Sequence, residues 1–251
     1  MEAVPDLPAR ETTAPPAPPA APAPAPWSSG RIGRATPHAR LATPVYLARH
    51  GQTESNLLRR YAGYSPEPLT EAGRAQMSGL AARLALCRIG EVWTSEVARS
   101  RESAELIAGI MGVSIRTEAR LNEIRMGPWE GLTEAEVAHD FPNAWALWCT
   151  LPDRLELAGR ETLQSLSRRV TAAVADAAER PHPVLLVSHV APIRVAVLMA
   201  LGLPLSTYKR LHVGNGDAVL LDRAGADVRR LGETGSLRAE LPLFSAESSL
   251  A

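Results

Sequence analysis

The chain has 251 residues, 45% of them apolar, which is enough for one domain with a substantial core. Lys and Arg together number 27, as do Asp and Glu, so the balance of charge does not indicate nucleic acid or an anionic membrane as a partner. The two distant cysteines, Cys87 and Cys149, favour a reducing compartment over a disulfide framework or a zinc site. No apolar run approaches the roughly 20 residues that span a bilayer, and the N-terminal residues lack the apolar core of a secretory signal. We therefore expect a cytoplasmic protein.

Residues 1–40 differ in composition from the remainder of the chain. Nine of the 21 prolines lie between Pro5 and Pro26, interleaved with alanine. Proline favours extended, solvated backbone, and a segment with few bulky apolar side chains does not offset its ordering entropy. We predict a disordered tail over 1–40, with a ligand for a proline-binding partner as the alternative, and a single domain over 41–251.

The predicted elements of the first half of the domain alternate between strands and helices. An apolar strand over 45–48 runs directly into the polar turn Arg49-His50-Gly51. A helix begins near Thr70, where apolar side chains then recur with helical spacing. Further elements are a strand over 91–94, a helix over 96–111 and a strand over 113–117.

The second half of the domain begins with an insertion at 126–159, whose weak periodicity and three tryptophans predict an irregular cap. Its remaining predicted elements are a helix over 161–178, a fully apolar strand over 184–187, a helix after Pro192 and a terminal hairpin formed by 216–221 and 227–231.

Alternation of strands and helices predicts an α/β domain with three α/β/α layers, a mostly parallel central sheet and a short cap insertion. Two apolar strands, one early and one late, each end at a histidine, His50 and His189. Ligands bind beyond the carboxyl ends of strands in such sheets. The two histidines are therefore expected to meet at one edge of the sheet.

The tripeptide Arg49-His50-Gly51 has the chemistry of a phosphate site. A neutral imidazole is a good nucleophile near neutral pH, and a neighbouring glycine allows a ligand to approach the backbone. The guanidinium of Arg49 offers a forked, permanently charged set of donors that matches phosphoryl oxygens. By itself this tripeptide is also compatible with a surface or core histidine.

Five motifs in order give a more specific reading. They are Leu47-Ala48-Arg49-His50-Gly51-Gln52-Thr53 with Asn56; Pro68-Leu69-Thr70-Glu71-Ala72-Gly73; Thr94-Ser95-Glu96-Val97-Ala98-Arg99; Leu121-Asn122-Glu123 followed by Gly127-Pro128-Trp129-Glu130-Gly131; and Val187-Ser188-His189. Together they resemble the histidine phosphatase (phosphoglycerate mutase-like) superfamily over roughly residues 44–201. The resemblance is to its phosphatase branch, α-ribazole phosphatase-like or of broad specificity.

The resemblance implies a role for each matching residue. His50 would form a phosphohistidine, surrounded by the charges and donors of Arg49, Arg99 and His189. Glu123 would protonate the leaving oxygen and later deprotonate the attacking water. Further phosphate contacts are expected from Gln52, Asn56 and Val190. The expected reaction requires no metal or cofactor, and the expected substrate is a small-molecule phosphate ester; a homodimer is a family-level expectation.

The chain also departs from the family pattern. Val190-Ala191 stands where many relatives have two glycines, so side chains there are expected to narrow the site while the backbone donors remain. Ser103 stands where threonine is common. Candidates to contact the remainder of the substrate are Arg125, Arg154 and Arg160, and Glu161 is assigned to the start of a helix, stabilised by the dipole.

Three functions remain open from the sequence. The first is a metal-independent phosphomonoesterase acting on a sugar phosphate, a nucleotide or a pathway intermediate. The second is a phosphoglycerate-type mutase, although residues 126–133 resemble those of phosphatases more than the His-Tyr-Gly pattern of mutases. The third is a catalytically silent module that binds a phosphorylated ligand, although His50, both arginines, Glu123 and His189 are all present.

Overall fold

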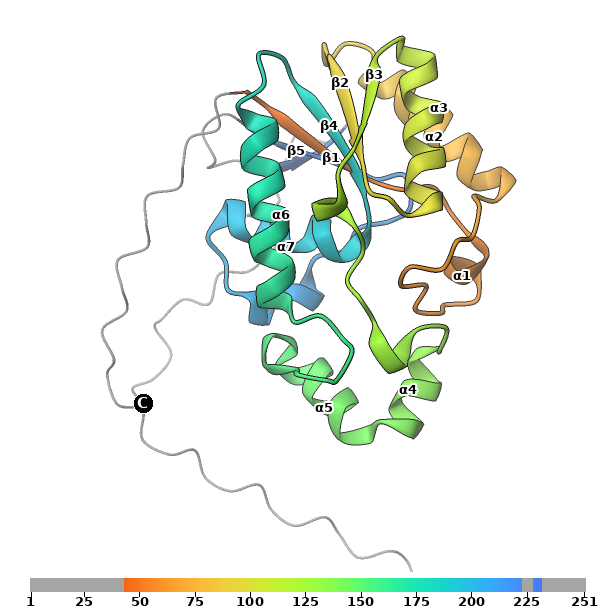
Figure 1. The fold of residues 1–251 in the computed structure, drawn as a ribbon, viewed down its shortest axis with the longest axis vertical. Helices are drawn as coiled ribbons and strands as arrows, with labels where there is room; N and C mark the ends of the chain where they lie inside the picture. Colours follow the sequence, from red (N-terminus) through yellow and green to blue (C-terminus); the bar gives the residue numbers. More distant parts are fainter. Residues whose placement is uncertain (1–42, 223–227, 232–251) are drawn as a thin grey trace, which may run out of the picture. The chain divides into compact units, whose positions relative to one another are not determined.

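The computed structural model describes residues 43–222 and 228–231 (Figure 1). The predicted tail over 1–40 lies outside these residues. The strands are β1 (Val45–Arg49), β2 (Glu91–Thr94), β3 (Ser114–Thr117), β4 (Val184–Ser188), β5 (Ala218–Leu221) and β6 (Val228–Arg230). The helices are α1 (Glu54–Leu57), α2 (Glu71–Leu84), α3 (Ala98–Met111), α4 (Glu134–Asp140), α5 (Pro142–Thr150), α6 (Leu163–Ala178) and α7 (Val190–Leu201).

The strands form one mixed sheet in the order β3-β2-β4-β1-β5-β6. The first four strands of this order are mutually parallel, and β5 and β6 are antiparallel to their neighbours. The predictions of a mostly parallel sheet and of a terminal hairpin are confirmed. This order places the late strand β4 between β2 and β1, with Arg49 opposite Ser188.

Alternate residues of the central strands face two separate hydrophobic clusters. In β1, Val45 and Leu47 pack with α6 and α7, whereas Tyr46 and Ala48 pack with α2 and α3. Figure 1 shows these two helix pairs on opposite sides of the sheet. Because strand side chains alternate between faces, an apolar run such as the one in β1 requires cover on both. The three-layer α/β/α architecture is therefore as predicted.

The cap over 126–159 is more regular than its weak periodicity predicted. It contains α4 and α5, with single 3₁₀ turns at Gly127–Trp129 and Pro152–Arg154. Thr133 and Glu136 form a reciprocal capping box at the start of α4, and Pro142 opens α5. These helices are too short for a clear helical repeat in the sequence, and buried tryptophans rather than a long apolar stripe hold them in place.

Helix α7 begins earlier than predicted. It starts at Val190, with His189 as its N-cap, and so includes Pro192 in its first turn. Proline is compatible with a first turn because the N–H groups there have no partner within the helix. The second histidine therefore lies at the junction between β4 and a helix N-terminus.

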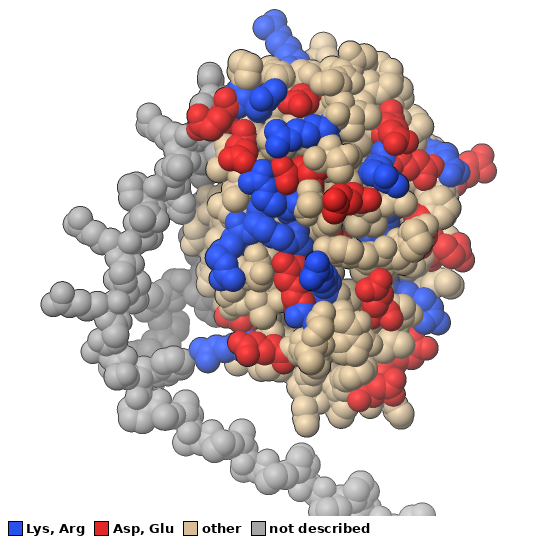
Figure 2. All heavy atoms as spheres, in the orientation of Figure 1, with Lys and Arg blue, Asp and Glu red and all other residues tan. Residues whose placement is uncertain are grey.

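Within the described ranges, no helix is both long and apolar enough to cross a bilayer. Figure 2 shows acidic and basic side chains interspersed on one face of the molecule, with basic ones gathered near its middle. This mixed surface agrees with the equal numbers of acidic and basic residues.

Candidate active site

Two neighbouring strand ends bring His50 and His189 together. His50 follows β1, His189 follows β4, and the backbone N–H of His50 donates to the carbonyl of Ser188 at 3.0 Å. The two ring centroids lie 5.1 Å apart at an interplanar angle of 61°. The meeting of the two histidines, expected from the topology, is observed.

The ring of His50 is held with one nitrogen available as a nucleophile. Its Nδ1 lies 2.7 Å from the carbonyl oxygen of Gly51, so Nδ1 carries the proton and donates it. Its Nε2 then has a lone pair, which accepts a hydrogen bond from Nε–H of Arg99 at 3.1 Å. Burial, together with the charges of Arg99 and Arg49, holds the pKa of His50 well below its ordinary value of 6.5. The ring is therefore neutral at physiological pH, as a nucleophile requires.

Gly51 is required here for packing against α2. A Cβ on Gly51 would collide with the backbone carbonyl of Gly73 in α2. The N–H of Gly51 also donates to Oγ of Ser103 at 3.1 Å, and that hydroxyl donates to the carbonyl of Arg99 at 2.7 Å. Ser103 thus joins the turn that carries His50 to the helix that carries Arg99.

Arg99 is buried rather than solvated. Its side chain extends from α3, only 1% of the residue is exposed, and its Nη2 donates to the carbonyl of Gly63 at 2.8 Å. Its Nη1 donates to the carbonyl of Ser65 at 3.2 Å, and Glu67 lies 4.0 Å away. Because carbonyl oxygens on the loop after α1 accept from both terminal nitrogens of the guanidinium, its Nε–H is directed at His50.

Arg49 supplies a second cation from the last position of β1. Its Nη1 donates to the carbonyl of Val213 at 2.7 Å, and its buried Nε has no partner among the described residues. Burial lowers the pKa of Arg49 to about 10, so the side chain remains charged at neutral pH. The free Nε edge is suited to an anionic oxygen.

Glu123 is a buried carboxyl group with the properties of a general acid. The residue is 7% exposed, and its Oε1 accepts the backbone N–H of Ile124 at 2.9 Å. Burial raises the pKa of Glu123 above its ordinary value of 4.5, although that hydrogen bond and the nearby arginines act in the opposite direction. A raised pKa keeps a larger fraction of the carboxyl protonated near neutral pH.

Arg169 of α6, which the sequence analysis did not single out, fixes the backbone around Glu123. Its guanidinium donates to the carbonyls of Arg120, Asn122 and Glu123 at 2.7–2.9 Å. It also donates to both carboxylate oxygens of Glu161 at 2.8 Å. The assignment of Glu161 to a helix start is corrected: α6 begins at Leu163 with Thr162 as its N-cap, and Glu161 is the partner of Arg169.

His189 lies deeper than His50. It is fully buried, its Nε2 lies 2.8 Å from Oγ of Ser95, and its Nδ1 has no partner within the described part of the chain. Burial, with the charge of Arg99, holds the pKa of His189 well below 6.5. Its ring packs against the edge of His50, and it is absent from the set of residues that line the cavity.

The remaining predicted phosphate contacts divide into two groups. Asn56 and Val190 line the cavity, and Oδ1 of Asn56 accepts from Asn215 Nδ2 at 2.8 Å, which leaves the Asn56 amide N–H₂ for a ligand. Val190 opens α7, so its backbone contributes the N-terminal end of a helix, which favours anions. Gln52 lies outside the lining, where its Oε1 accepts from Oγ1 of Thr70 at 3.1 Å.

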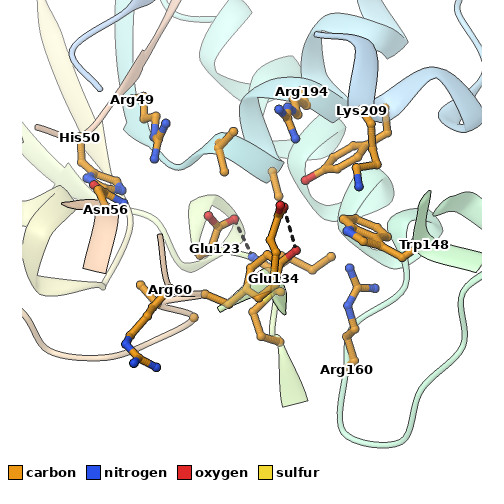
Figure 3. Close-up of a pocket in the computed structure, with 18 of the residues that line it drawn as sticks. Arg49, His50, Asn56, Arg60, Glu123, Glu134, Trp148, Arg160, Arg194 and Lys209 are labelled. Carbon is orange, nitrogen blue, oxygen red and sulfur yellow. Dashed lines mark hydrogen bonds between the residues drawn. The ribbon is translucent and has the colours of Figure 1, made fainter. Parts of the chain in front are cut away.

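The cavity in front of His50 has a volume of about 140 Å³, which suits a small molecule (Figure 3). Arg160 lines it, whereas the other two candidates, Arg125 and Arg154, do not. Tyr61 and Trp148 also line it. The sequence analysis missed several other lining residues, which come from distant segments: Arg60, Glu134, Arg194, Tyr208 and Lys209. Across residues 43–222 and 228–231, no three His, Cys, Asp or Glu side chains are grouped so as to hold a metal ion.

Comparisons with known proteins agree with this geometry. A relative from Klebsiella pneumoniae (strain 342), "Probable phosphoglycerate mutase GpmB", is 38% identical over 176 residues, covering 68% of this chain and 80% of the relative. The "Adenosylcobalamin/alpha-ribazole phosphatase" of Salmonella typhimurium is 30% identical over 174 residues, covering 68% of this chain and 86% of that protein.

Among solved structures, the mycobacterial glucosyl-3-phosphoglycerate phosphatase Rv2419c with VO3 matches with a TM-score of 0.65 and 28% identity. The match covers 70% of this chain and 91% of that chain. The model of the histidine phosphatase superfamily (branch 1) matches residues 45–232, the range that contains all the site residues described above. The chain belongs to the histidine phosphatase superfamily, branch 1.

Proposed function

We propose that this protein is a phosphomonoesterase that transfers the phosphoryl group of a small phosphorylated metabolite to His50 and then to water. The observation that carries the proposal is the state of the His50 ring. Its Nδ1 proton is donated to the carbonyl of Gly51, and its Nε2 lone pair accepts from Arg99, which lines the same cavity as His50. A histidine held in this tautomer beside two guanidinium groups is suited to attack on phosphorus.

In the first step Nε2 of His50 forms a bond to phosphorus, and the bond between phosphorus and the ester oxygen breaks. Arg99 donates to Nε2 in the substrate-free site, so it exchanges this hydrogen bond for phosphoryl oxygens when substrate binds. Arg49 offers its free Nε edge to the same charge. Fixed cations of this kind stabilise the charge on the equatorial oxygens of a loose transition state.

Glu123 supplies the proton that the leaving alkoxide needs. Its raised pKa increases the fraction of the carboxyl that is protonated and able to give that proton. In the second step the resulting carboxylate accepts a proton from water as the water oxygen bonds to phosphorus and the bond from Nε2 to phosphorus breaks. The products are an alcohol and inorganic phosphate, and the enzyme returns to its starting protonation state.

A mutase is the second candidate, because the 38% identical relative is named as a probable phosphoglycerate mutase. The two functions differ only in the acceptor for the phosphoryl group on His50. Water as acceptor gives hydrolysis, whereas a substrate hydroxyl gives an isomeric ester. The phosphatase names of the Salmonella relative and of the mycobacterial structure support the first.

The test is turnover of a panel of sugar phosphates, nucleoside monophosphates and phosphorylated acids in ¹⁸O-labelled water. The proposal predicts inorganic phosphate that carries one ¹⁸O from solvent, and its loss in His50→Ala. Isomerised ester without released phosphate would establish the mutase. No turnover of any ester, with tight binding of phosphate, would favour the silent binding module.

A further inference from the structure

Arg160 is a buried cation without an anionic partner. The residue is 7% exposed, and its Nε and Nη2 are buried with no hydrogen-bond partner among the described residues. Its remaining nitrogen, Nη1, donates to the carbonyl of Glu161 at 3.2 Å. Buried donors are normally satisfied, and buried charges are normally paired, so an exception of this kind indicates a missing ligand.

The neighbours of Arg160 do not replace an anion. The carboxylate next to it in the sequence, Glu161, uses both oxygens to bind Arg169. The guanidinium instead lies over aromatic rings, 4.4 Å from the centroid of Trp148 and 5.2 Å from that of Trp129. Cation–π contacts of this kind attract a charge but leave its N–H donors in the ring plane free for another group.

Two further cations lie at the same end of the cavity. Arg194 lies 5.0 Å from the ring of Tyr208, and Nζ of Lys209 lies 5.6 Å from that of Trp148. Figure 3 shows Arg160, Trp148 and Lys209 on the opposite side of the cavity from His50. We call Arg160, Arg194 and Lys209 the distal subsite.

The cations that line the cavity differ in whether they have an acidic partner. Arg60 is paired with Glu136 at 3.1 Å, and Arg99 lies 4.0 Å from Glu67. Among the described residues, the three cations of the distal subsite have no acidic side chain within 4.0 Å. A phosphate ester bound at His50 would therefore leave the distal subsite without a counter-ion.

We propose that the distal subsite binds a second anionic group of the substrate, a carboxylate or a second phosphate. This inference rests on the proposed phosphomonoesterase function and narrows its substrates to esters with two anionic ends. The scissile phosphate lies against His50, and the second anion accepts from the unpartnered Nε and Nη2 of Arg160. The aromatic walls formed by Tyr61, Trp148 and Tyr208 enclose the part of the substrate between them.

The experiment compares esters that differ only in the second anion. 3-Phosphoglycerate and glycerol 3-phosphate differ by a carboxylate, and fructose 1,6-bisphosphate and fructose 6-phosphate by a phosphate. The wild-type protein should prefer the member with the second anion in one of these pairs by about 10–100-fold in kcat/KM, as expected for a charge-assisted hydrogen bond. The pair that shows the preference identifies the second anion as a carboxylate or a phosphate.

Arg160→Gln should reduce that preference to within about threefold, mainly by slowing the doubly anionic ester. Arg160→Lys should keep part of it, because the charge is retained without the fork of donors. The matched control is Arg154→Gln, which alters an exposed arginine of the cap that does not line the cavity and should keep the wild-type ratio. A ratio of two rates does not depend on the fraction of folded enzyme, so partial misfolding would not produce the predicted change.

The inference is overturned if the wild-type protein shows no preference in either pair, or if Arg160→Gln slows both members equally. Binding of the same compounds to His50→Ala, with and without Arg160→Gln, gives a readout that needs no turnover. A protein that hydrolyses none of the esters but still binds the doubly anionic members through Arg160 would refute the proposed hydrolysis and retain the distal subsite.

Discussion

Replacing Arg169 with methionine tests whether this residue positions the general acid. Its guanidinium donates five hydrogen bonds, three to the backbone carbonyls around Glu123 and two to Glu161. Methionine keeps most of the apolar stem but leaves those carbonyls and the carboxylate of Glu161 without their donor. Arg169→Met is therefore a test of geometry at Glu123 that leaves Glu123 itself in place.

The size of the effect follows from the burial of the pair. The side chains of Arg169 and Glu161 are 20% and 12% exposed, so neither lies in bulk solvent. Removing one partner of a buried ion pair lowers the free energy of unfolding by about 3–5 kcal/mol. Because both side chains here keep some exposure, we expect Arg169→Met to lower it by about 3 kcal/mol. A displacement of about 1 Å at Glu123 would lower the rate by about 100-fold.

The dependence on leaving group separates the two effects. An alkyl phosphate requires protonation of its leaving oxygen, whereas an aryl phosphate such as p-nitrophenyl phosphate requires little. Arg169→Met should therefore lower kcat/KM for alkyl phosphates by about 100-fold and for the aryl phosphate by less than about threefold. Urea unfolding measures the loss of stability, and rates are measured where the variant remains folded.

The matched control is Arg168→Met, which alters the exposed neighbour on the same helix. It should leave the stability and both rates close to wild type. Equal losses on alkyl and aryl phosphates in Arg169→Met would refute the positioning role and leave Arg169 a purely structural residue.

Three further outcomes are expected. For an alkyl phosphate, kcat/KM should fall as pH rises through the raised pKa of Glu123, because the carboxyl group that donates the proton becomes deprotonated. The lowered pKa of His50 keeps the nucleophile neutral down to below pH 6.5. Glu123→Gln should remove the alkaline fall, and a fall that persists would assign it to another group. Gly51→Ala should lower the free energy of unfolding by about 1–3 kcal/mol, because its Cβ meets the carbonyl of Gly73; an unchanged melting temperature would contradict this packing. Deleting residues 1–40 should leave kcat/KM unchanged, since all the site residues lie beyond them; a large loss would make the tail part of the site.

The residues that we propose to bind the phosphoryl group could be predicted because each stands in a local pattern. His50 and His189 both end apolar strands, and parallel strands present such ends at one edge of the sheet. Arg99 was predicted from its place in an ordered motif, although its immediate sequence is typical of a solvated helix. Its burial comes from carbonyl groups of Gly63 and Ser65, which no local pattern reveals.

The residues that support the site could not be predicted in the same way. Arg169 and Glu161 are separated by eight positions, so they do not match the three- or four-residue spacing of a helical pair. The distal cations Arg194 and Lys209 come from α7 and from the 3₁₀ helix Leu205–Arg210 that follows it, and they line the same cavity as residues from the first half of the domain. Their roles depend on tertiary packing and not on periodicity.

The cap illustrates the same limit. Its tryptophans pack against one another, since Trp129 and Trp148 are buried, with ring centroids 6.1 Å apart, and Trp148 also lines the cavity. The burial of Arg160 against the same rings followed from no feature of its sequence, because an arginine before a helix start is normally solvated.

The most direct measurement is capture of the covalent state of His50. Protein mixed rapidly with a ³²P-labelled ester and quenched in alkali, where phosphohistidine survives, should carry label on the peptide that contains His50. The label should appear faster than steady-state turnover, be lost in acid and be absent from His50→Ala. Steady-state hydrolysis with no labelled protein at any quench time, or label on another residue, would contradict a reaction that proceeds through this imidazole.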